Sequence, residues 1–243
     1  MTFEKIDLAN WKRKETFEHY YQQQTSFSIT TEIDLTKLKQ ALDQHGIKLY
    51  PALIFLLTEV VNSNSVFRTS FNQDGDLGIW KKLNPMYTLF HQTSKTFSAI
   101  WTDSSTDFRQ FHRNYQADVA QYGSSETLFP KKPIPENTVS ISMIPWTSFT
   151  GFNLNINTNK NHLLPIITAG KFEMKDEALL LPLSLQVHHA VCDGYHASLF
   201  MNAVQERADK QSIGLCSSKK QSFNQKVARL ISISGGSLPR RNG

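Results

Sequence analysis

Two adjacent histidines, His188 and His189, lie five and four residues before Asp193 in the stretch Gln186 to His196, which reads QVHHAVCDGYH. They directly follow residues 179–187, an apolar run that indicates a buried β-strand. A side chain at a strand end is held rigidly and can still reach a cleft, and an imidazole takes up a proton near neutral pH. The stretch therefore predicts a proton-transfer site at the end of this strand.

The histidine pair has three interpretations. As a metal site it would recruit His189, Asp193 and His196, whose spacings of four and three share a face of a helix, but Gly194 interrupts the segment. As structural groups, both imidazoles would be satisfied by hydrogen bonds in the core. As a catalytic base, one of them would face a cleft. Residue types and spacing alone do not decide between the last two.

Composition and charge restrict the class of protein. The 243 residues are 40% hydrophobic and 19% charged, which is ordinary for a soluble globular protein. A chain of this length can bury a core without disulfides or structural metals. The net charge of +5 is modest and the cations form no stripe before the C-terminal end. An anionic small-molecule ligand is therefore favoured over a nucleic-acid surface.

Cysteines and chain ends predict a cytoplasmic protein with no membrane segment. Cys192 and Cys216 form no disulfide framework or ligand spacing, and Cys192 is interpreted as a small buried residue rather than a nucleophile. The N-terminus has no apolar signal region. The longest apolar stretch, residues 51–61, contains Glu59 and is too short to span a bilayer.

Hydrophobic periodicity predicts both strands and helices. Asp34 is expected to cap a helix that ends near Gly46, and Pro51 is expected to open a helix that is apolar on all sides. Later helices are predicted at residues 108–122 and 195–208. Alternation of period two predicts a strand at residues 27–33, and the hairpin signal Asp74-Gly75 predicts strands at 66–71 and 77–80. Further strands are predicted at residues 87–91, 97–101, 138–144, 165–172 and 179–187.

These elements favour a mixed α/β fold, a two-layer sandwich in which a large mixed β-sheet is packed with helices, over a doubly wound sheet. The reason is that the later strands outnumber the later helices and hairpin-like links predominate. Residues 1–210 are predicted to form a single domain. Residues 211–243 are polar and are predicted to be a flexible tail, with nucleic-acid binding by the tail as an alternative.

The stretch Gln186 to His196 resembles the signature of the chloramphenicol acetyltransferases. The short HHxxxDG pattern also occurs in other CoA-dependent acyltransferases, so its companions along residues 1–202 carry the specificity. They come in the order expected for the family: NWKRKETF (10–17), YP (50–51), FHQ (90–92), TFSA (96–99), SMIPW (142–146), FNLN (152–155), PIIT (165–168) and LLLPLS (179–184).

The resemblance implies a CoA-dependent acyltransferase-like fold and acetyl transfer from acetyl-CoA to the primary (3-) hydroxyl of chloramphenicol, with no metal. It places the general base on His189 and makes His188 its structural neighbour. It makes the Ser142 hydroxyl the donor to a tetrahedral oxyanion. It also pairs Asp193 with Arg13 as support for the site, although the spacing invites a triad in which Asp193 orients the imidazole.

Binding residues also follow from the resemblance. CoA is expected near Trp146 and Lys171, with Phe172 where the family has a tyrosine. The family assembles as a trimer with each active site between subunits, so a homotrimer is expected. Chloramphenicol is expected to be surrounded by Tyr20, Phe97, Phe129, Leu154 and Thr168.

Two alternative functions stay open from the sequence. The protein could bind chloramphenicol or CoA and sequester it without turnover, although binding alone needs neither His189 nor Ser142. It could also transfer an acyl group to dihydrolipoamide, as in the related dehydrogenase-complex cores, although the chain shows no lipoyl domain or linker.

Overall fold

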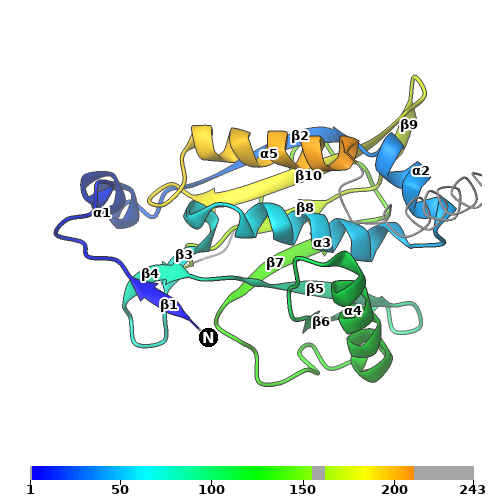
Figure 1. The fold of residues 1–243 in the computed structure, drawn as a ribbon, viewed down its shortest axis with the longest axis horizontal. Coiled ribbons are helices and arrows are strands. Elements are labelled where there is room, and N and C mark those ends of the chain that lie inside the picture. Colours follow the sequence, from blue (N-terminus) through cyan, green and yellow to red (C-terminus); the bar gives the residue numbers. More distant parts are fainter. Residues whose placement is uncertain (1, 155–161, 211–243) are drawn as a thin grey trace, which may run out of the picture.

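The computed structural model describes residues 2–154 and 162–210. Within them the strands form a large sheet in the order β2-β10-β8-β7-β5-β6, with β9 beside β10, and a small sheet in the order β1-β4-β3 (Figure 1). The strands are β1 (Phe3–Lys5), β2 (Ser26–Asp34), β3 (Thr69–Phe71), β4 (Leu77–Trp80), β5 (Asn84–His91), β6 (Thr96–Trp101), β7 (Thr138–Met143), β8 (Ile166–Ala169), β9 (Glu173–Lys175) and β10 (Ala178–His188).

The large sheet is mixed, because β7 runs parallel to both β5 and β8 while the other neighbours pair antiparallel. Helices α3 and α5 lie side by side against one face of this sheet (Figure 1). The predicted mixed sheet packed with helices is therefore confirmed. The helices are α1 (Lys14–Gln22), α2 (Thr36–Gln44), α3 (Leu49–Asn62), α4 (Phe108–Tyr122) and α5 (Gly194–Asp209), with a 3₁₀ turn at Ser65–Arg68.

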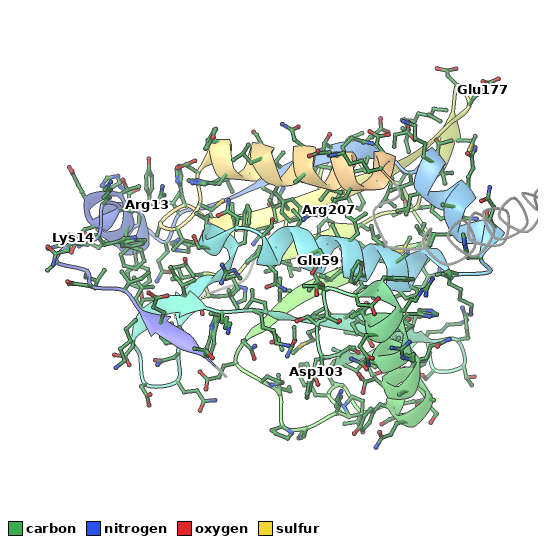
Figure 2. All side chains as sticks on the ribbon, viewed as in Figure 1. Arg13, Lys14, Glu59, Asp103, Glu177 and Arg207 are labelled. Atoms are coloured by element: carbon green, nitrogen blue, oxygen red, sulfur yellow. The ribbon has the colours of Figure 1, made fainter. Side chains whose placement is uncertain are left out.

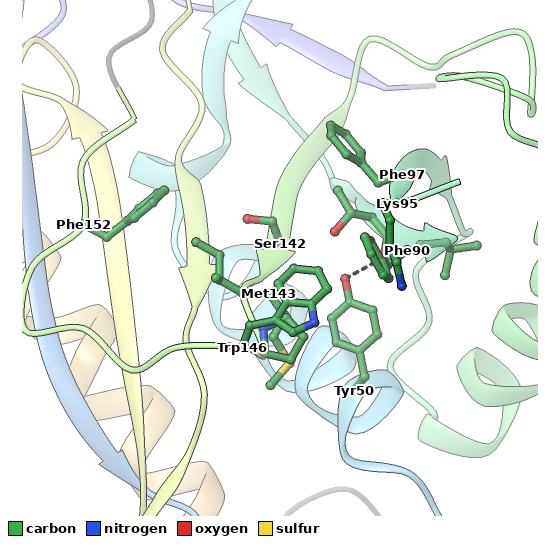
Figure 3. Close-up of a pocket in the computed structure, with 12 residues that line it drawn as sticks. Tyr50, Phe90, Lys95, Phe97, Ser142, Met143, Trp146 and Phe152 are labelled. Carbon is green, nitrogen blue, oxygen red and sulfur yellow. Dashed lines mark hydrogen bonds between the residues drawn. The ribbon is translucent and has the colours of Figure 1, made fainter. Parts of the chain in front are cut away.

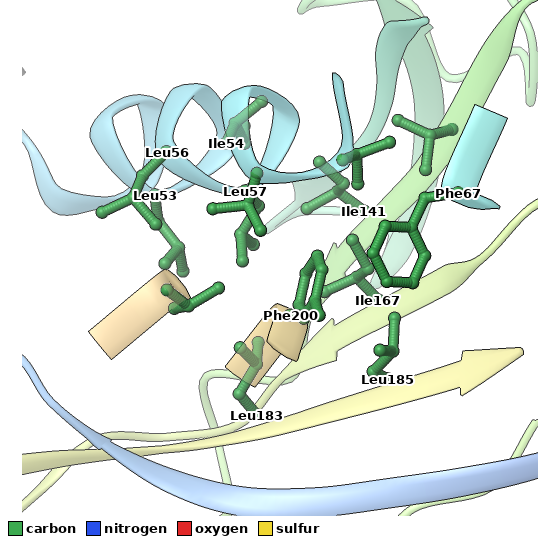
Figure 4. Packing of buried hydrophobic residues seen from close by; sticks show 14 of the residues in the cluster. Leu53, Ile54, Leu56, Leu57, Phe67, Ile141, Ile167, Leu183, Leu185 and Phe200 are labelled. Carbon is green, nitrogen blue, oxygen red and sulfur yellow. The ribbon is translucent and has the colours of Figure 1, made fainter. Parts of the chain in front are cut away.

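The core lies between the helix pair and the sheet. Strand β10 sends Leu183 and Leu185 into it, both fully buried, because every second side chain of a strand points to the same face. Phe200 of α5 packs between them and α3, whose Leu57 is fully buried as well (Figure 4). The all-round apolar sequence of α3 is explained by this position, in which the helix contacts α5, α4 and β5.

The opposite face of the same sheet is polar. Ser184 alternates with the core leucines of β10, lies across from Thr168 of β8, and donates its hydroxyl to the carbonyl of Phe152. Gln186 follows on the same face and bonds the backbone of Leu154 through its side-chain amide. The segment after β7 is therefore tied across this polar face.

Several boundaries differ from the sequence-based expectation. Residues 66–71 form a strand only from Thr69, because the Asn64 side chain accepts the Val66 N–H at 3.0 Å and starts a 3₁₀ turn instead. Helix α3 begins at Leu49, two residues before Pro51. The Asp34 carboxylate accepts the Thr36 N–H at 2.8 Å, just outside the assigned cap, Leu35. The three-residue strands β1 and β9 were not predicted, because they are too short to show a period.

Other expectations of the sequence stay predictions. No helix among residues 2–154 and 162–210 has both the length and the apolar character needed to cross a bilayer. The division at residue 210 and the flexible tail at 211–243 fall at or beyond the described residues. The cytoplasmic location is likewise a prediction.

The packing of α3 gives the first prediction. Replacing Leu57 by Ala should lower the free energy of unfolding by about 2–5 kcal/mol, because it leaves a cavity between helix and sheet. Leu199→Ala is the matched control, because Leu199 is 41% exposed on α5 and its loss should cost under about 0.5 kcal/mol. Denaturant unfolding of both variants measures this, and equal costs would contradict the assigned core.

Candidate active site

Ser142 lies on the polar face of β7, next to the core residue Ile141. Its hydroxyl is 3.1 Å from the hydroxyl of Thr168 on the parallel neighbour β8, and Thr168 is only 3% exposed. Either hydroxyl can donate in this bond. When Thr168 donates, the Ser142 proton is free to point at another acceptor.

A pocket with a volume of about 750 Å³ opens over Ser142. Figure 3 shows the serine hydroxyl between Phe152 on one side and Phe90 and Phe97 on the other. The Phe90 ring meets the edge of the Trp146 indole at 4.6 Å. The lining is mostly apolar and comprises Tyr50, Thr88, Leu89, Phe90, Lys95, Phe97, Ser142, Met143, Ile144, Pro145, Trp146 and Phe152.

Tyr50 supplies a fixed polar group in this wall. Its hydroxyl donates to the Thr88 carbonyl at 3.1 Å, which holds the phenol against β5 (Figure 3). Burial raises the pKa of Tyr50 to about 12, so the phenol stays neutral at physiological pH. The pocket is thus an aromatic cavity with Ser142 as a hydroxyl on its floor, suited to a ligand with an aromatic or apolar body.

The two histidines at the end of β10 have different surroundings. His188 is buried, and its Nδ1 accepts the Ala190 N–H at 3.1 Å. Burial, and then the charges of His162 and His189, lower the pKa of His188, so this ring stays neutral and shapes the turn. His189 is half-buried, and its backbone N–H donates to the Thr25 carbonyl at 2.8 Å.

Aromatic rings set the plane of the His189 imidazole. Tyr20 of α1 stacks on it with centroids 3.8 Å apart and planes 4° apart. Phe27 of β2 meets it edge-on at 5.3 Å. His189 Nδ1 is buried and has no hydrogen-bond partner among the described residues. The ring is therefore oriented by packing rather than by a hydrogen bond.

Asp193 is paired with Arg13 and not with His189. Its Oδ2 is 3.0 Å from Arg13 Nη1, and Oδ1 is 2.8 Å from His196 Nδ1 in a capping box at the start of α5. Arg13 lies at the start of α1, at the end of the molecule that β10 reaches (Figure 2). The contacts of Asp193 are those expected of a structural anion and not of a triad member.

The ionisation of Asp193 follows from these contacts. Burial raises its pKa, but the hydrogen bond from Arg13 and the charges of His196 and Arg13 outweigh burial, so the pKa of Asp193 is lowered overall. The carboxylate is thus charged at physiological pH. Within residues 2–154 and 162–210, no three His, Cys, Asp or Glu side chains are grouped to hold a metal ion.

Cys192, next to Asp193, is not placed as a nucleophile. It is 1% exposed, and burial followed by the negative charge of Asp193 raises its pKa to about 12. The thiolate, which is the reactive form, is therefore scarce at neutral pH. Cys216 lies outside the described residues.

Ser142 and His189 of one chain are far apart. Ser142 pairs with Thr168, and Thr168 pairs with Ser184, so Ser184 lies two strands away on the same row. His189 follows five residues later, one residue past the end of β10. With strands about 4.8 Å apart and a rise of about 3.3 Å per residue, their Cα atoms are about 19 Å apart. The two side chains of one chain cannot contact the same reacting group.

The remaining expected site residues lie in the Ser142 pocket, next to His189, or outside both. Phe97 and Trp146 line the Ser142 pocket, whereas Tyr20 lies with His189. Leu154 is 45% exposed, and exposed Lys171 bonds the Thr147 carbonyl through its backbone, next to Trp146. Phe129 is half-buried outside the pocket lining.

Other residues of the pocket, among them Tyr50, Phe90 and Met143, were not predicted as site residues from the sequence. Phe90 and Phe97 share a face because they are cross-strand partners in the β5–β6 pairing, which alternation within each strand does not give. Nor does alternation show that this face adjoins Ser142, because that depends on the β5–β7 pairing.

Comparison with solved structures shows which known proteins share this fold. A chloramphenicol acetyltransferase aligns with a TM-score of 0.75 at 21% identity, covering 84% of this chain and 99% of that one. A probable dihydrolipoamide acetyltransferase from Listeria monocytogenes aligns with a TM-score of 0.56 at 13% identity, covering 82% of this chain and 91% of that one. The fold is that of the CoA-dependent acyltransferases.

Sequence comparison identifies one family within the CoA-dependent acyltransferases. The family model described as chloramphenicol acetyltransferase matches residues 1–205. A chloramphenicol acetyltransferase from Staphylococcus aureus is 63% identical over 210 residues, covering 86% of this chain and 97% of the relative. One from Clostridium perfringens is 47% identical over 209 residues, covering 86% and 95%. The chain belongs to the chloramphenicol acetyltransferase family and is an acyltransferase, which confirms the resemblance.

The Arg13–Asp193 pair gives a prediction on stability. Because the folded-state pKa of Asp193 is lowered, its contribution is present above the ordinary Asp value and is lost as pH falls through the folded value. A double-mutant cycle of Arg13→Met and Asp193→Asn should give a coupling of about 1 kcal/mol at pH 7, discounted because the pair is partly exposed.

The pH dependence is the check on this coupling. The cycle, repeated by denaturant unfolding from pH 7 to pH 3, should show a coupling that shrinks as the carboxylate is protonated. A coupling that is constant over this range would contradict an ionic contribution from Asp193.

Proposed function

We propose that this chain transfers the acetyl group of acetyl-CoA to the primary (3-) hydroxyl of chloramphenicol and so inactivates the antibiotic. The observation that carries the proposal is the Ser142 hydroxyl on the floor of an aromatic pocket, in a chain that is 63% identical to a chloramphenicol acetyltransferase. An aromatic cavity suits the nitrophenyl ring of this acceptor, and the Ser142 hydroxyl suits a reaction that develops an oxyanion.

His189 is the proposed general base. Its Nε2 takes the proton from the acceptor hydroxyl, because a primary alcohol is a poor nucleophile until it is deprotonated. The alcohol oxygen then attacks the thioester carbonyl carbon, with no acyl-enzyme. As the tetrahedral intermediate collapses, the carbon–sulfur bond breaks and the His189 imidazolium returns the proton to the departing thiolate. The stacking with Tyr20 supports this role by fixing the direction of the ring.

Ser142 is the proposed donor to the oxyanion of the intermediate. The buried Thr168 hydroxyl lies 3.1 Å from the Ser142 hydroxyl. Thr168 can therefore donate to the Ser142 oxygen and leave the serine proton directed into the pocket. A preset donor of this kind stabilises charge that appears only during the reaction, and its removal typically costs about 10²–10³-fold in rate.

The other expected residues complete the binding proposal. Trp146, 59% exposed at the pocket mouth, and Lys171 beside it are proposed to contact CoA. Arg13 and Asp193 are proposed to hold the shape of the site through their ion pair. Chloramphenicol is proposed to contact Tyr20, Phe97, Phe129, Leu154 and Thr168.

We further propose a homotrimer in which His189 of one chain faces the Ser142 pocket of the next. The separation of about 19 Å within one chain, estimated from strand spacing and rise, supports this assembly. A cyclic arrangement brings each chain's His189 group to a neighbour's pocket and leaves no half-site unused.

The first functional prediction concerns His189. His189→Ala should lower chloramphenicol-dependent release of CoA thiol from acetyl-CoA by about 10²–10⁴-fold, because the base is lost. His45→Ala is the control, because His45 is an exposed histidine at the end of α2. Thiol release is followed with a chromogenic thiol reagent. Unchanged activity in His189→Ala would remove it as the base, and tight chloramphenicol binding without turnover by the parent chain would favour sequestration.

A second functional prediction tests the site between chains. His189→Ala and Ser142→Ala chains, each nearly inactive alone, are unfolded together in equal amounts and refolded. About one quarter of the interfaces then pair an intact His189 with an intact Ser142, so activity should return to about one quarter of the parent value. Refolding each variant alone is the control. A mixture as inactive as its components would contradict a site shared by two chains.

A further inference from the structure

Lys131 is a partly buried cation outside the two groups described above. Its Nζ is 2.6 Å from Asp118 Oδ1 and 3.0 Å from the Trp101 carbonyl, and it lies 3.9 Å from the centroid of the Trp101 ring. The side chains of Lys131 and Asp118 are each only 14% exposed. Lysines are rarely this buried unless they are paired, so the contact is a specific anchor.

The anchor is itself fixed to the core. Asp118, on α4, accepts a hydrogen bond from the Thr102 hydroxyl at 2.7 Å through its other oxygen. Thr102 is 2.8 Å from the hydroxyl of Tyr87, which is fully buried in β5. A chain of four side chains therefore connects Lys131 to the strand that also carries Thr88 of the pocket wall.

Lys131 lies at one end of a short segment beside β6. At the other end, the Leu128 carbonyl accepts the Ala99 N–H at 2.7 Å. Leu128 therefore lies beside Ala99 of β6, while Lys131 reaches the Trp101 carbonyl two residues further along this strand. Phe129 lies between these two anchors. Phe97, two residues before Ala99 and on the same face of β6, lines the Ser142 pocket.

We propose that Lys131 is a positioning residue for the acceptor side of the active site. Its contacts with Asp118 and Trp101 hold residues 128–131 against the edge of β6, so that Phe129 extends the aromatic wall begun by Phe97. The inference rests on the proposed function, because it concerns the site for the aromatic acceptor. Trp146, proposed for CoA, follows β7, which β5 separates from β6, and its ring contacts Phe90 of β5.

The test uses variants that separate position from stability. Lys131→Met keeps the aliphatic stem and removes the ammonium, which leaves the partly buried Asp118 without its cation. Lys131→Met combined with Asp118→Asn removes the stranded charge as well. Lys132→Met is the matched control, because Lys132 is the exposed neighbour. For each, KM for chloramphenicol, KM for acetyl-CoA, kcat and the melting temperature are measured.

Lys131→Met should raise KM for chloramphenicol by about tenfold and leave KM for acetyl-CoA within about twofold, a loss in the range of one lost charged contact. The double variant should regain most of the lost melting temperature while KM for chloramphenicol stays raised, because the segment is still not anchored. Lys132→Met should match the parent chain.

Two results would overturn the inference while the proposed function stands. One is a double variant with parental stability and a parental KM for chloramphenicol, which would make the pair purely structural. The other is an equal rise of KM for both substrates. Absence of chloramphenicol-dependent thiol release in the parent chain would instead refute the proposed function, and the inference with it. If Lys131→Met fails to fold, the KM values and melting temperature of the double variant alone test the inference.

Discussion

Alternation along the strands of the large sheet is the constraint on which the rest of the molecule depends. One set of side chains, such as Leu183 and Ile141, packs under α3 and α5, and the intervening set, such as Ser184 and Ser142, faces away from the helices. A slip of one residue in β7 would exchange Ser142 for Ile141 and place a hydroxyl in the core. The apolar packing that stabilises the fold therefore also fixes which side chains are available for chemistry.

The register of the large sheet also keeps Ser142 and Thr168 apart from His189. Ser142 and Thr168 pair with each other on the inner strands β7 and β8, and Thr168 also pairs with Ser184 on its other side. His189 lies just beyond the end of β10, where pairing with β2 stops and the chain turns into α5. A rigid sheet cannot bring these positions together by a local movement. The proposed reaction, which uses both groups, would therefore need a second chain to supply one of them.

Local patterns sufficed to predict elements whose residues all interact nearby. The helix at 108–122 and the strand at 77–80 coincide with α4 and β4, because the helix has a clear apolar spacing and the strand follows the turn signal Asp74-Gly75. The strand expected from 66 failed because a single side-chain bond from Asn64 outweighed the apolar pattern. Tyr50 escaped notice as a pocket residue because its position depends on β5, which lies 38 residues along at Thr88. The pairing of Arg13 with Asp193 spans 180 residues and came from family resemblance alone.

The use of Asp193 shows why a carboxylate close to a histidine in sequence need not act on it. Asp193 caps the first turn of α5, where its charge is favoured by the free N–H groups of the helix. Both carboxylate oxygens already have partners, Arg13 and His196, so turning toward His189 would strand the half-buried guanidinium. Orientation of the His189 ring therefore falls to the flat contact with Tyr20 and the edge of Phe27. Since Arg13 and Tyr20 both belong to α1 or its cap, the ion pair at the start of this helix also helps to hold the Tyr20 ring that stacks on His189.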